Sequence, residues 1–563
     1  MQEEEDKEQK RNMMVFFIVT LLIMLGYSYF FPQSAPVAQQ QIQQESAQVQ
    51  DIRTARNTHQ RAAVSTRTEK VETIKIENAR ISGTISTKGL KFNNIILKDY
   101  KEKYDSSEKV SVFGGDRPYF ASSGWIAEDP SVILPDENSC WSANQTTLTP
   151  DSPVVLTWDN GDGLLFMKTI SLDDNFVFTI TDSVKNYGSD VVKLKNTMTI
   201  HRELASEKSS ESFGFYNGPI GYLSNKLQEV EYEDMRKKEI VHQTQGGWFG
   251  ITDKYWLVSF VLEQNASYNI YYRCERGAYV IESRDEFSRI SPSSELSKQH
   301  RLFVGAKEIN TLDMYEEKLG VPHFDLVIDF GYLYILTKPL LYAISYVKDL
   351  VGNMGLGILL ITLLLRLLLF PLANKSYRAM NKMRLIQPKI KALQQRYAND
   401  QMKLGQAVSD LYKREKVNPL GGCLPVFLQW PILFALYKVL YISIEMRQAP
   451  FFGWIHDLSI ADPWSVLNLG GLIPLPLPGF LQIGIWPLLM GLSMFIQQKM
   501  SPTSVDPSQE KVMLIMPIMF TFMFAQLPSG LVIYWTFSNL LAIFQQYFVM
   551  KLDDKKQIEE VVH

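Results

Sequence analysis

Apolar and polar residues follow different patterns in the two halves of the chain. Between about residues 71 and 320, short segments such as 74–85 and 176–184 are separated by Gly, Asn, Asp and Ser. Within these segments apolar and polar residues tend to alternate, which is typical of β-strands with one buried face. The pattern predicts an all-β sandwich domain, which we place at residues 71–328.

Six apolar segments outside this domain have about the length that a bilayer core requires. They are residues 13–31, 354–373, 421–441, 480–498, 512–527 and 531–550. The alternative for the first segment is a cleaved secretory signal. However, no small-x-small cleavage site follows it, and Pro36 disrupts the best candidate cleavage site, so we interpret the segment as a retained anchor helix. Residues 32–70, rich in Gln, Ser, Ala and Thr, predict a flexible linker. The predicted fold class is a multi-domain membrane protein with six transmembrane helices, five of them in a core at 353–550.

The basic residues orient these segments. The connection at 374–420 carries 11 Lys and Arg residues and 3 Asp and Glu residues. In residues 442–479, by contrast, Arg447 is the only Lys or Arg. Loops rich in Lys and Arg stay cytoplasmic. We therefore expect cytoplasmic termini at 1–12 and 551–563 and an exported β domain. Residues 329–352 predict an amphipathic helix in the membrane interface. A seventh span there is the alternative, and the Lys and Arg count of the next loop argues against it.

The basic connection has a helical pattern of its own. Apolar residues recur at spacings of three and four, and they are Ala379, Met383, Ile386, Ile390, Leu393 and Tyr397, then Leu404, Val408 and Leu411. This spacing predicts a helical hairpin at 374–420. Its basic face includes Lys382, Arg384, Lys389, Lys391 and Arg396. The hairpin either packs only on itself or meets lipid headgroups, ribosomal RNA or a targeting factor.

Arg366 lies within the apolar segment 354–373, and the last five apolar segments contain no Asp, Glu or His. An Arg at the centre of a transmembrane helix costs roughly 2.5 to 3.5 kcal/mol and usually faces a protein interior or a hydrated cavity. Snorkelling is the alternative, but Lys375, the next charge, lies about 13 Å further along a helix. We expect a hydrated groove around Arg366.

Polar uncharged residues on the neighbouring segments fit such a groove. They are Thr362, Gln429, Ser538 and Asn539. Alternatively, each joins two helices by hydrogen bonds. The segment 512–527 is short and ends at Pro528-Ser529-Gly530, which predicts local membrane thinning. Its flexible side chains form a candidate client-facing apolar wall, with ordinary packing as the alternative, and they are Met516, Met519, Phe520 and Met523. A locally thin membrane, a positively charged groove and a flexible apolar wall together predict that this protein inserts membrane proteins.

Several functional classes lack their required residues. The chain has no GxxxxGK[ST] loop for nucleotide hydrolysis, and its apolar segments lack the general base of an intramembrane protease. We expect no catalytic residues, cofactor or metal site, and therefore no enzyme. Three cysteines are too few for a disulfide scaffold, but Cys140 and Cys274 either form one disulfide in the exported domain or remain two thiols.

The chain resembles the YidC/Oxa/Alb family of membrane protein insertases, in the Gram-negative form with a large periplasmic domain. The resemblance rests on ordered motifs between about residues 350 and 550, namely Arg366 with Pro371, residues 416–423, 447–451, 454–458, 498–503 and 528–531, and Ser538 with Asn539. It implies a five-helix core with a groove open to the cytoplasm and to lipid, and a β-super-sandwich like that of galactose mutarotases. It also implies location in the bacterial inner membrane.

The implied partners are nascent membrane proteins, membrane lipids, the Sec translocon, and ribosomes delivered by signal recognition particle and its receptor; no DNA is expected. The chain departs from the family in its loop at 472–487 and in its short mixed-charge tail. Where the family often has Tyr beside Tyr534, this chain has Trp535, which we expect in the groove. The alternatives are a channel or transporter with an exported binding domain, and an anchored carbohydrate-acting enzyme, which would leave five spans without a purpose.

Overall fold

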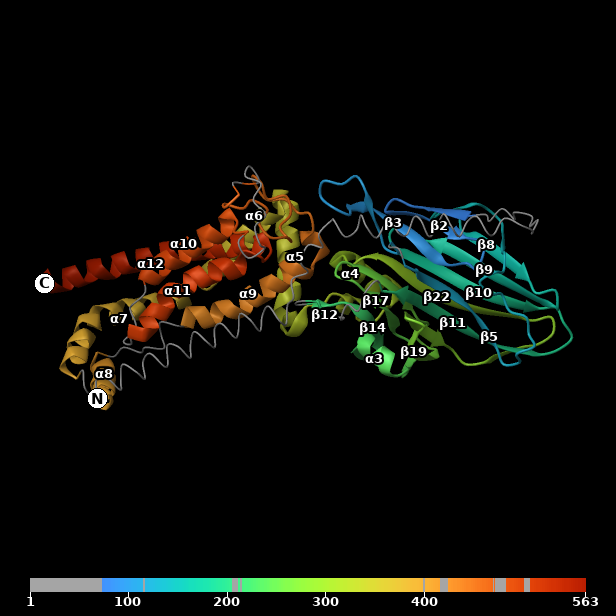
Figure 1. Ribbon diagram of the computed structural model, residues 1–563, viewed down its shortest axis with the longest axis horizontal. Coiled ribbons are helices and arrows are strands. Elements are labelled where there is room, and N and C mark those ends of the chain that lie inside the picture. The colour runs from blue at the N-terminus through green and yellow to red at the C-terminus, as the bar shows by residue number, and fades with distance from the viewer. Residues whose placement is uncertain are drawn as a thin grey trace, which may run out of the picture. The chain divides into compact units, whose positions relative to one another are not determined.

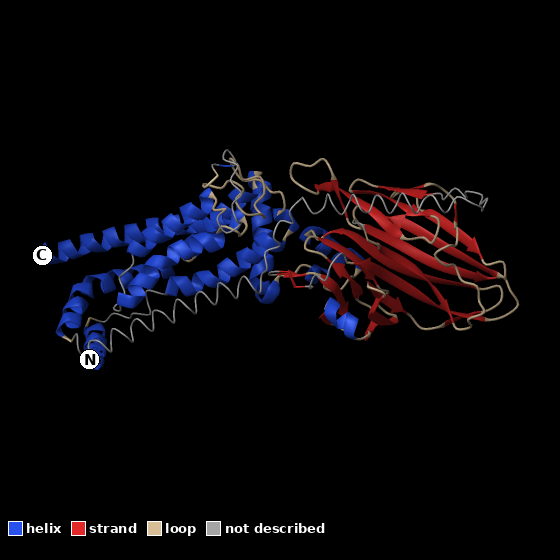
Figure 2. Ribbon diagram, viewed as in Figure 1, coloured by secondary structure: helices blue, strands red, loops and turns tan. Residues whose placement is uncertain are grey.

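A computed structural model describes residues 73–114, 117–204, 211–212, 215–397, 400–415, 424–468, 470, 482–500 and 507–562. The predicted anchor helix at 13–31 and the linker at 32–70 lie outside these residues. Strands occupy the first part of the described chain, and helices occupy most of the remainder (Figure 2).

Two large sheets form the β domain (Figure 1). Along the first sheet the strands are β16 (Ile240–Gln245), β19 (Ser267–Glu275), β20 (Ala278–Arg284), β11 (Val192–Glu203), β5 (Tyr119–Ala127), β3 (Phe92–Lys101), β2 (Ile81–Ser86), β1 (Thr73–Glu77) and β7 (Thr147–Leu148), with β21 (Ser288–Ile290) beside β11 and β4 (Lys109–Ser111) beside β3. Along the second they are β15 (Lys226–Glu229), β14 (Gly218–Leu223), β17 (Trp248–Thr252), β18 (Trp256–Val261), β22 (Glu295–Ala306), β10 (Val177–Asn186), β9 (Leu164–Leu172), β8 (Val154–Asp159) and β6 (Ser142–Ala143). A further pair joins β12 (Glu211–Ser212) and β13 (Phe215–Tyr216).

The two sheets pack face to face, as the alternating pattern predicts. Every second residue of β9 is buried, and Phe92 of β3 packs edge-on against Phe178 of β10 with ring centroids 5.2 Å apart. Such inward-facing pairs are the core of a β-sandwich. Helices α3 (Tyr232–Lys237) and α4 (Ile309–Leu319) complete the domain, and the short helices η1 (Phe324–Val327) and η2 (Gly331–Leu333) follow.

The structure corrects the disulfide hypothesis, because Cys140 and Cys274 do not form a disulfide. Cys140 pairs with Lys88 just beyond β2, whereas Cys274 lies on β19, five strands away along the first sheet. Neighbouring strands lie about 4.8 Å apart, so the two residues are separated by on the order of 20 Å. A disulfide requires Cα atoms within about 7 Å.

Each predicted core segment is helical over most of its described residues, with non-helical residues at 369, 482–484 and 525–527. The helices are α5 (Tyr334–Val351), α6 (Met354–Leu368), α7 (Phe370–Arg396), α8 (Gln401–Arg414), α9 (Leu424–Ile442), α10 (Ile485–Met500), α11 (Pro507–Phe524) and α12 (Ser529–Val562), with the short η4 (Ile444–Met446) after α9. Helix α5 covers most of the predicted helix at 329–352, and it buries one face and exposes Ile335, Tyr346 and Leu350 on the other. Its position in the membrane interface stays a prediction.

The apolar segment 354–373 is not one straight helix. It breaks at Leu369, where α6 ends and α7 begins at an angle of 67°. Pro371 stands in the first turn of α7, where its missing N–H costs nothing, but it cannot continue the hydrogen bonding of α6. By length and apolarity, no single helix in the described ranges passes the test for a membrane span. Helices α6 and α7 pass this test only together, as a bent pair.

Helices α7 and α8 form the predicted hairpin. Ile386, Ile390, Val408 and Leu411 are buried in a small core of their own, with Met383, Leu393 and Leu404 packed against it. Seven of the nine residues of the predicted apolar pattern therefore lie in the contact between the two helices, whereas Ala379 and Tyr397 are not part of this core. All five basic residues named above are exposed, and Lys389 forms an ion pair with Glu415 at 2.8 Å.

Candidate functional site

Arg366 lies in the last turn of α6, three residues before the bend. Its guanidinium Nη2 donates to two oxygens of Ser538 on α12, the hydroxyl at 2.7 Å and the carbonyl at 2.9 Å, and to Gln429 Oε1 on α9 at 3.4 Å. The side chain therefore joins three helices. The C-terminal end of a helix also favours a positive charge, because the last carbonyl groups carry partial negative charge.

These three helices and the first turn of α7 line a groove with about 540 Å³ of empty space, solvent included. Its polar lining consists of Thr362, Arg366, Gln429, Tyr534 and Ser538, and its apolar lining consists of Leu365, Leu369, Leu372, Ala373 and Ile432. Arg366 is charged and none of the other nine lining residues is acidic, so these residues leave its charge unneutralised. The arrangement can attract a negatively charged or strongly polar group.

The α6 side of the groove follows from helical spacing. Thr362, Leu365, Arg366 and Leu369 lie at intervals of three and four and share one face. Thr362 donates its hydroxyl hydrogen to the Ile358 carbonyl one turn earlier, at 2.7 Å, so it offers the groove only an acceptor. Gln429 donates to Ser538 Oγ at 3.3 Å and holds this hydroxyl beside Arg366.

Two predicted groove residues lie elsewhere on α12. Asn539 donates to Ser493 Oγ of α10 at 3.0 Å, and Trp535 packs on Phe524 and Phe520 of α11 at centroid distances of 4.7 and 6.1 Å. Both residues are about 100° around the helix from Ser538 or Tyr534. Tyr534, one turn before Ser538, lines the groove instead. Because Tyr534 and Ser538 are one helical turn apart, they share a face of α12. This spacing identifies Tyr534 as a lining residue once Ser538 is assigned to the hydrated face.

The predicted apolar wall on α11 divides into two parts. Met516 and Met523 are exposed by 36% and 42%, as a client- or lipid-facing surface requires, and Met519 is half-buried. Phe520 instead packs against Phe524 and Trp535, so it supports the α11–α12 contact. Leu514, Ile515, Ile518 and Phe522 are also exposed, and periodicity alone did not select them.

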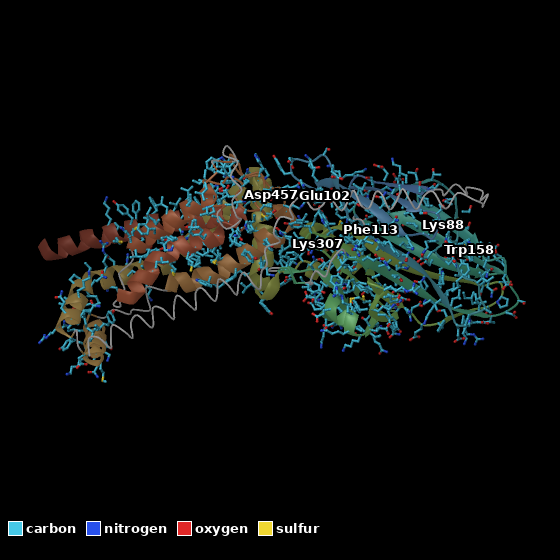
Figure 3. The ribbon with its side chains drawn as sticks, in the orientation of Figure 1. Lys88, Glu102, Phe113, Trp158, Lys307 and Asp457 are labelled. Atoms are coloured by element: carbon cyan, nitrogen blue, oxygen red, sulfur yellow. The ribbon has the colours of Figure 1, made fainter. Side chains whose placement is uncertain are left out.

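Lys307 in the β domain is a buried cation. Lys307 (Figure 3) is 5% exposed and donates to Thr252 Oγ1 at 2.9 Å and the Val327 carbonyl at 3.2 Å. Burial lowers the pKa of Lys307 to about 7, although the charges of Asp253 and Asp329 act to raise it. Because the amine is enclosed and hydrogen-bonded, it is a structural group rather than a binding site.

Two family models match the chain. The model described as YidC periplasmic domain matches residues 73–343, and the model described as 60Kd inner membrane protein matches residues 346–557. Together they cover the β domain and the helices that form the groove.

Full-length relatives match as well. A membrane protein insertase YidC of Rickettsia massiliae is 40% identical over 549 residues, which cover 94% of this chain and 97% of the relative. The corresponding protein of Rickettsia prowazekii is 41% identical over 545 residues with the same coverage.

A crystal structure described as an active YidC insertase, with its first transmembrane domain resolved, aligns with 86% of this chain and 93% of its own. The alignment has 17% identity and a TM-score of 0.37. The family assignment therefore depends on the sequence matches, which extend over almost the whole chain. On these matches, the chain belongs to the YidC family of membrane protein insertases.

Proposed function

We propose that this protein inserts integral membrane proteins into the bacterial inner membrane and assists their folding. The observation that carries the proposal is the guanidinium of Arg366, which no acidic lining residue neutralises, in a partly polar groove lined by α6, α7, α9 and α12. The relatives are named insertases rather than enzymes. Their names do not favour the alternative of a transporter.

The groove lowers the cost of transferring a polar segment. A polar or acidic stretch of a client would lose its hydration in hydrocarbon, and each unpaired polar group would cost several kcal/mol there. In the groove, Gln429, Tyr534 and Ser538 supply hydrogen-bonding groups, and Arg366 supplies a positive charge. The client is held at Arg366 only by reversible electrostatic attraction, so it leaves the groove again.

The helices next to the groove favour lateral release. Helix α6 has 15 residues, about 22 Å in length, which is short against a hydrocarbon core of about 30 Å. Local thinning of the membrane would follow. Exposed Leu364 and Leu367 of α6 and Met516 and Met523 of α11 present an apolar surface along which the client's hydrophobic segment passes into lipid.

The remaining elements have proposed roles in topology and delivery. Six membrane-spanning helices, with cytoplasmic termini and a periplasmic β domain, place the α7–α8 hairpin in the cytoplasm. Its exposed basic residues then meet ribosomes or the signal recognition particle receptor. Larger clients are handled beside the Sec translocon, and small clients are handled by this protein alone.

The test is insertion into liposomes that contain only the purified protein. A short single-span client with an acidic exported tail is synthesised in vitro, and protease protection of the tail is measured. Arg366→Ala should reduce protection of this client by about tenfold, equivalent to about 1.4 kcal/mol of lost attraction, and Arg366→Lys should reduce it less.

A client whose tail is neutral but otherwise identical should be affected much less by Arg366→Ala. The control variant Lys413→Ala removes the same charge from an exposed position of α8 and should insert both clients normally. Equal losses for both clients would contradict the electrostatic role of Arg366. Protection no greater than in empty liposomes would contradict independent insertion.

A further inference from the structure

We propose that His300 is an acid-sensitive trigger that opens one end of the β domain. Its imidazole lies in a layer of buried polar side chains between the two sheets, and this layer separates a small apolar core from the main hydrophobic cluster. Protonation of His300 opens the small core and leaves the main hydrophobic cluster closed. The proposal is independent of the groove and of the proposed insertase activity.

The polar layer crosses five strands of the sandwich. On β9, Lys168 lies between Phe166 of the small core and Ile170 of the main hydrophobic cluster. On the other four strands the members of the layer are Asp182 of β10, Asn196 of β11, Ser123 of β5, and Lys298 with His300 of β22. The small core consists of Trp125, Leu164, Phe166, Val184, Leu194 and Ile290. Trp158, which packs on this core, lies at the opposite end of the β domain from Lys307 (Figure 3).

Hydrogen bonds and an ion pair within the layer join the two sheets. Lys168 Nζ of β9 donates to the Ser123 carbonyl of β5 at 3.2 Å and forms an ion pair with Asp182 of β10. Asn196 Nδ2 of β11 donates to Asp182 Oδ2 at 3.2 Å. Lys168 and Asp182 are 3% and 2% exposed, so their opposite charges balance inside the domain. A further buried charge without a partner would destabilise this arrangement.

The imidazole of His300 is enclosed and has no partner. His300 is 3% exposed, and neither ring nitrogen has a hydrogen-bond partner in the part of the chain that the structure describes. The ring packs edge-on against Phe260 of β18, with centroids 5.7 Å apart. Burial lowers the pKa of His300 to about 4, against 6.5 in an unfolded chain. The closed domain therefore accommodates the neutral imidazole and disfavours the imidazolium.

The charged groups that face His300 leave no counter-ion for an imidazolium. Asp182 Oδ2 lies 3.7 Å from His300 Nε2, but Asp182 is already the partner of the Lys168 ammonium. Lys298, two residues away on β22, is paired with Asp285 at 3.0 Å. Protonation of His300 therefore adds one positive charge to two matched ion pairs. Because the small core is separate from the main hydrophobic cluster, it can open by itself and hydrate the new charge.

Hydrogen exchange of the full-length protein in detergent tests the proposal. Deuterium uptake is measured by mass spectrometry at pH 7.5 and pH 5, with correction for the intrinsic exchange rates. A group whose pKa is about 4 in the closed state and 6.5 in the open state raises the opening constant about thirtyfold between these pH values. Peptides with residues 164–166, 184–186 and 192–194 should show this rise. Peptides with residues 257–261 and 302–306, from the main hydrophobic cluster, should change less than about threefold.

One variant and one matched control assign the effect. His300→Gln removes the titrating group, so the opening constant of the small core should change less than about threefold between the two pH values. His323→Asn removes an exposed imidazole of the same domain and should keep the full rise. No rise in the wild type would overturn the proposal, whether or not His300→Gln folds. The same rise in His300→Gln, or an equal rise in the small core and the main hydrophobic cluster, would overturn it as well.

Discussion

Arg366 persists in an apolar helix because several contributions to its stability coincide. The expected cost of an Arg within a membrane-spanning helix is roughly 2.5 to 3.5 kcal/mol. Two hydrogen bonds from a charged donor to Ser538 contribute about 1.5 to 3 kcal/mol each, and the C-terminal end of α6 contributes about 0.3 to 1 kcal/mol. These values offset the cost without an acidic partner. A charge can therefore be retained in this groove and still remain available to a client.

Lys307 carries a prediction about pH, because its pKa is about 7 in the folded protein against 10.5 in an unfolded chain. Between pH 7 and 10.5 the unfolded chain binds more protons at this residue, so stability should rise with pH across this window. Below pH 7 both states are protonated and this contribution is constant. Lys307→Met should therefore reduce the slope of unfolding free energy against pH between 7 and 10, measured by urea unfolding of the full chain.

Thr252→Val is the matched control for Lys307. It removes the hydroxyl that accepts the Lys307 hydrogen bond but adds no titrating group. It should lower stability at every pH and leave most of the slope. Identical slopes for the wild type and Lys307→Met would contradict the assignment of this pH dependence to Lys307.

At the scale of elements, α12 organises the helical region through two polar stripes. Tyr534, Ser538 and Gln545 form one stripe, which lines the groove and reaches Asn374 of α7 at 2.9 Å. Asn539 and Gln546 form the other, which contacts Ser493 and the Met500 carbonyl of α10. The stripes differ by one residue, or about 100° around the helix. Neighbouring polar residues on one helix therefore have different roles, one in the groove and one in helix packing.

The contact between α10 and α11 gives a prediction at the same scale. A Cβ on Gly491 would lie 2.0 Å from Thr521 Oγ1, which itself donates to the Pro517 carbonyl at 2.8 Å. Gly491→Ala should therefore destabilise the protein by roughly 1 to 3 kcal/mol, as overpacking does. Thermal unfolding of the full chain in detergent measures the effect.

The double variant Gly491→Ala/Thr521→Ala removes the clashing hydroxyl and should recover most of the loss. Gly405→Ala is the control, because a Cβ there meets nothing within 4 Å. It should stabilise α8 by about 0.5 to 1 kcal/mol. A Gly491→Ala variant as stable as the wild type would show that α10 and α11 do not pack this closely.

At the scale of the whole molecule, the α7–α8 hairpin is packed separately from the groove. Its core of Ile386, Ile390, Val408 and Leu411 is distinct from the main hydrophobic cluster, which includes Tyr534 and Ile361. Changes on the exposed face of the hairpin therefore leave the groove intact. Delivery of a client and its insertion can then be tested independently.

Reversing three hairpin charges tests this separation. The triple variant Lys382→Glu, Lys391→Glu and Arg396→Glu should abolish salt-sensitive co-sedimentation with ribosomes, because it replaces three positive charges by three negative ones. Insertion of a client already released from the ribosome should remain within about twofold of the wild type. Substitution of the same residues by Gln is the matched control and should give an intermediate loss of ribosome binding. Equal losses in both assays would contradict independent roles for hairpin and groove.

Sequence patterns alone predicted the β domain, most of the helices, most of the hairpin core and the importance of Arg366, although the segment 74–85 forms two strands, β1 and β2, rather than one. These features depend on periodicity and on a single charge in an apolar segment, and such signals come from residues close together in the chain. The motifs around Arg366, Pro371 and Ser538 also identified the family. The number of membrane spans and their orientation stay predictions.

Which residues face one another became known from the three-dimensional structure. It broke the segment 354–373 at Leu369, turned Trp535 and Asn539 away from the groove, and gave Arg366 its partner on a helix 172 residues further along the chain. It also separated Cys140 from Cys274 by several strands of the first sheet. Apart from the break at Leu369, these outcomes depend on the rotation and approach of elements distant in sequence. Local patterns leave this geometry open, because one apolar face can pack against many partners.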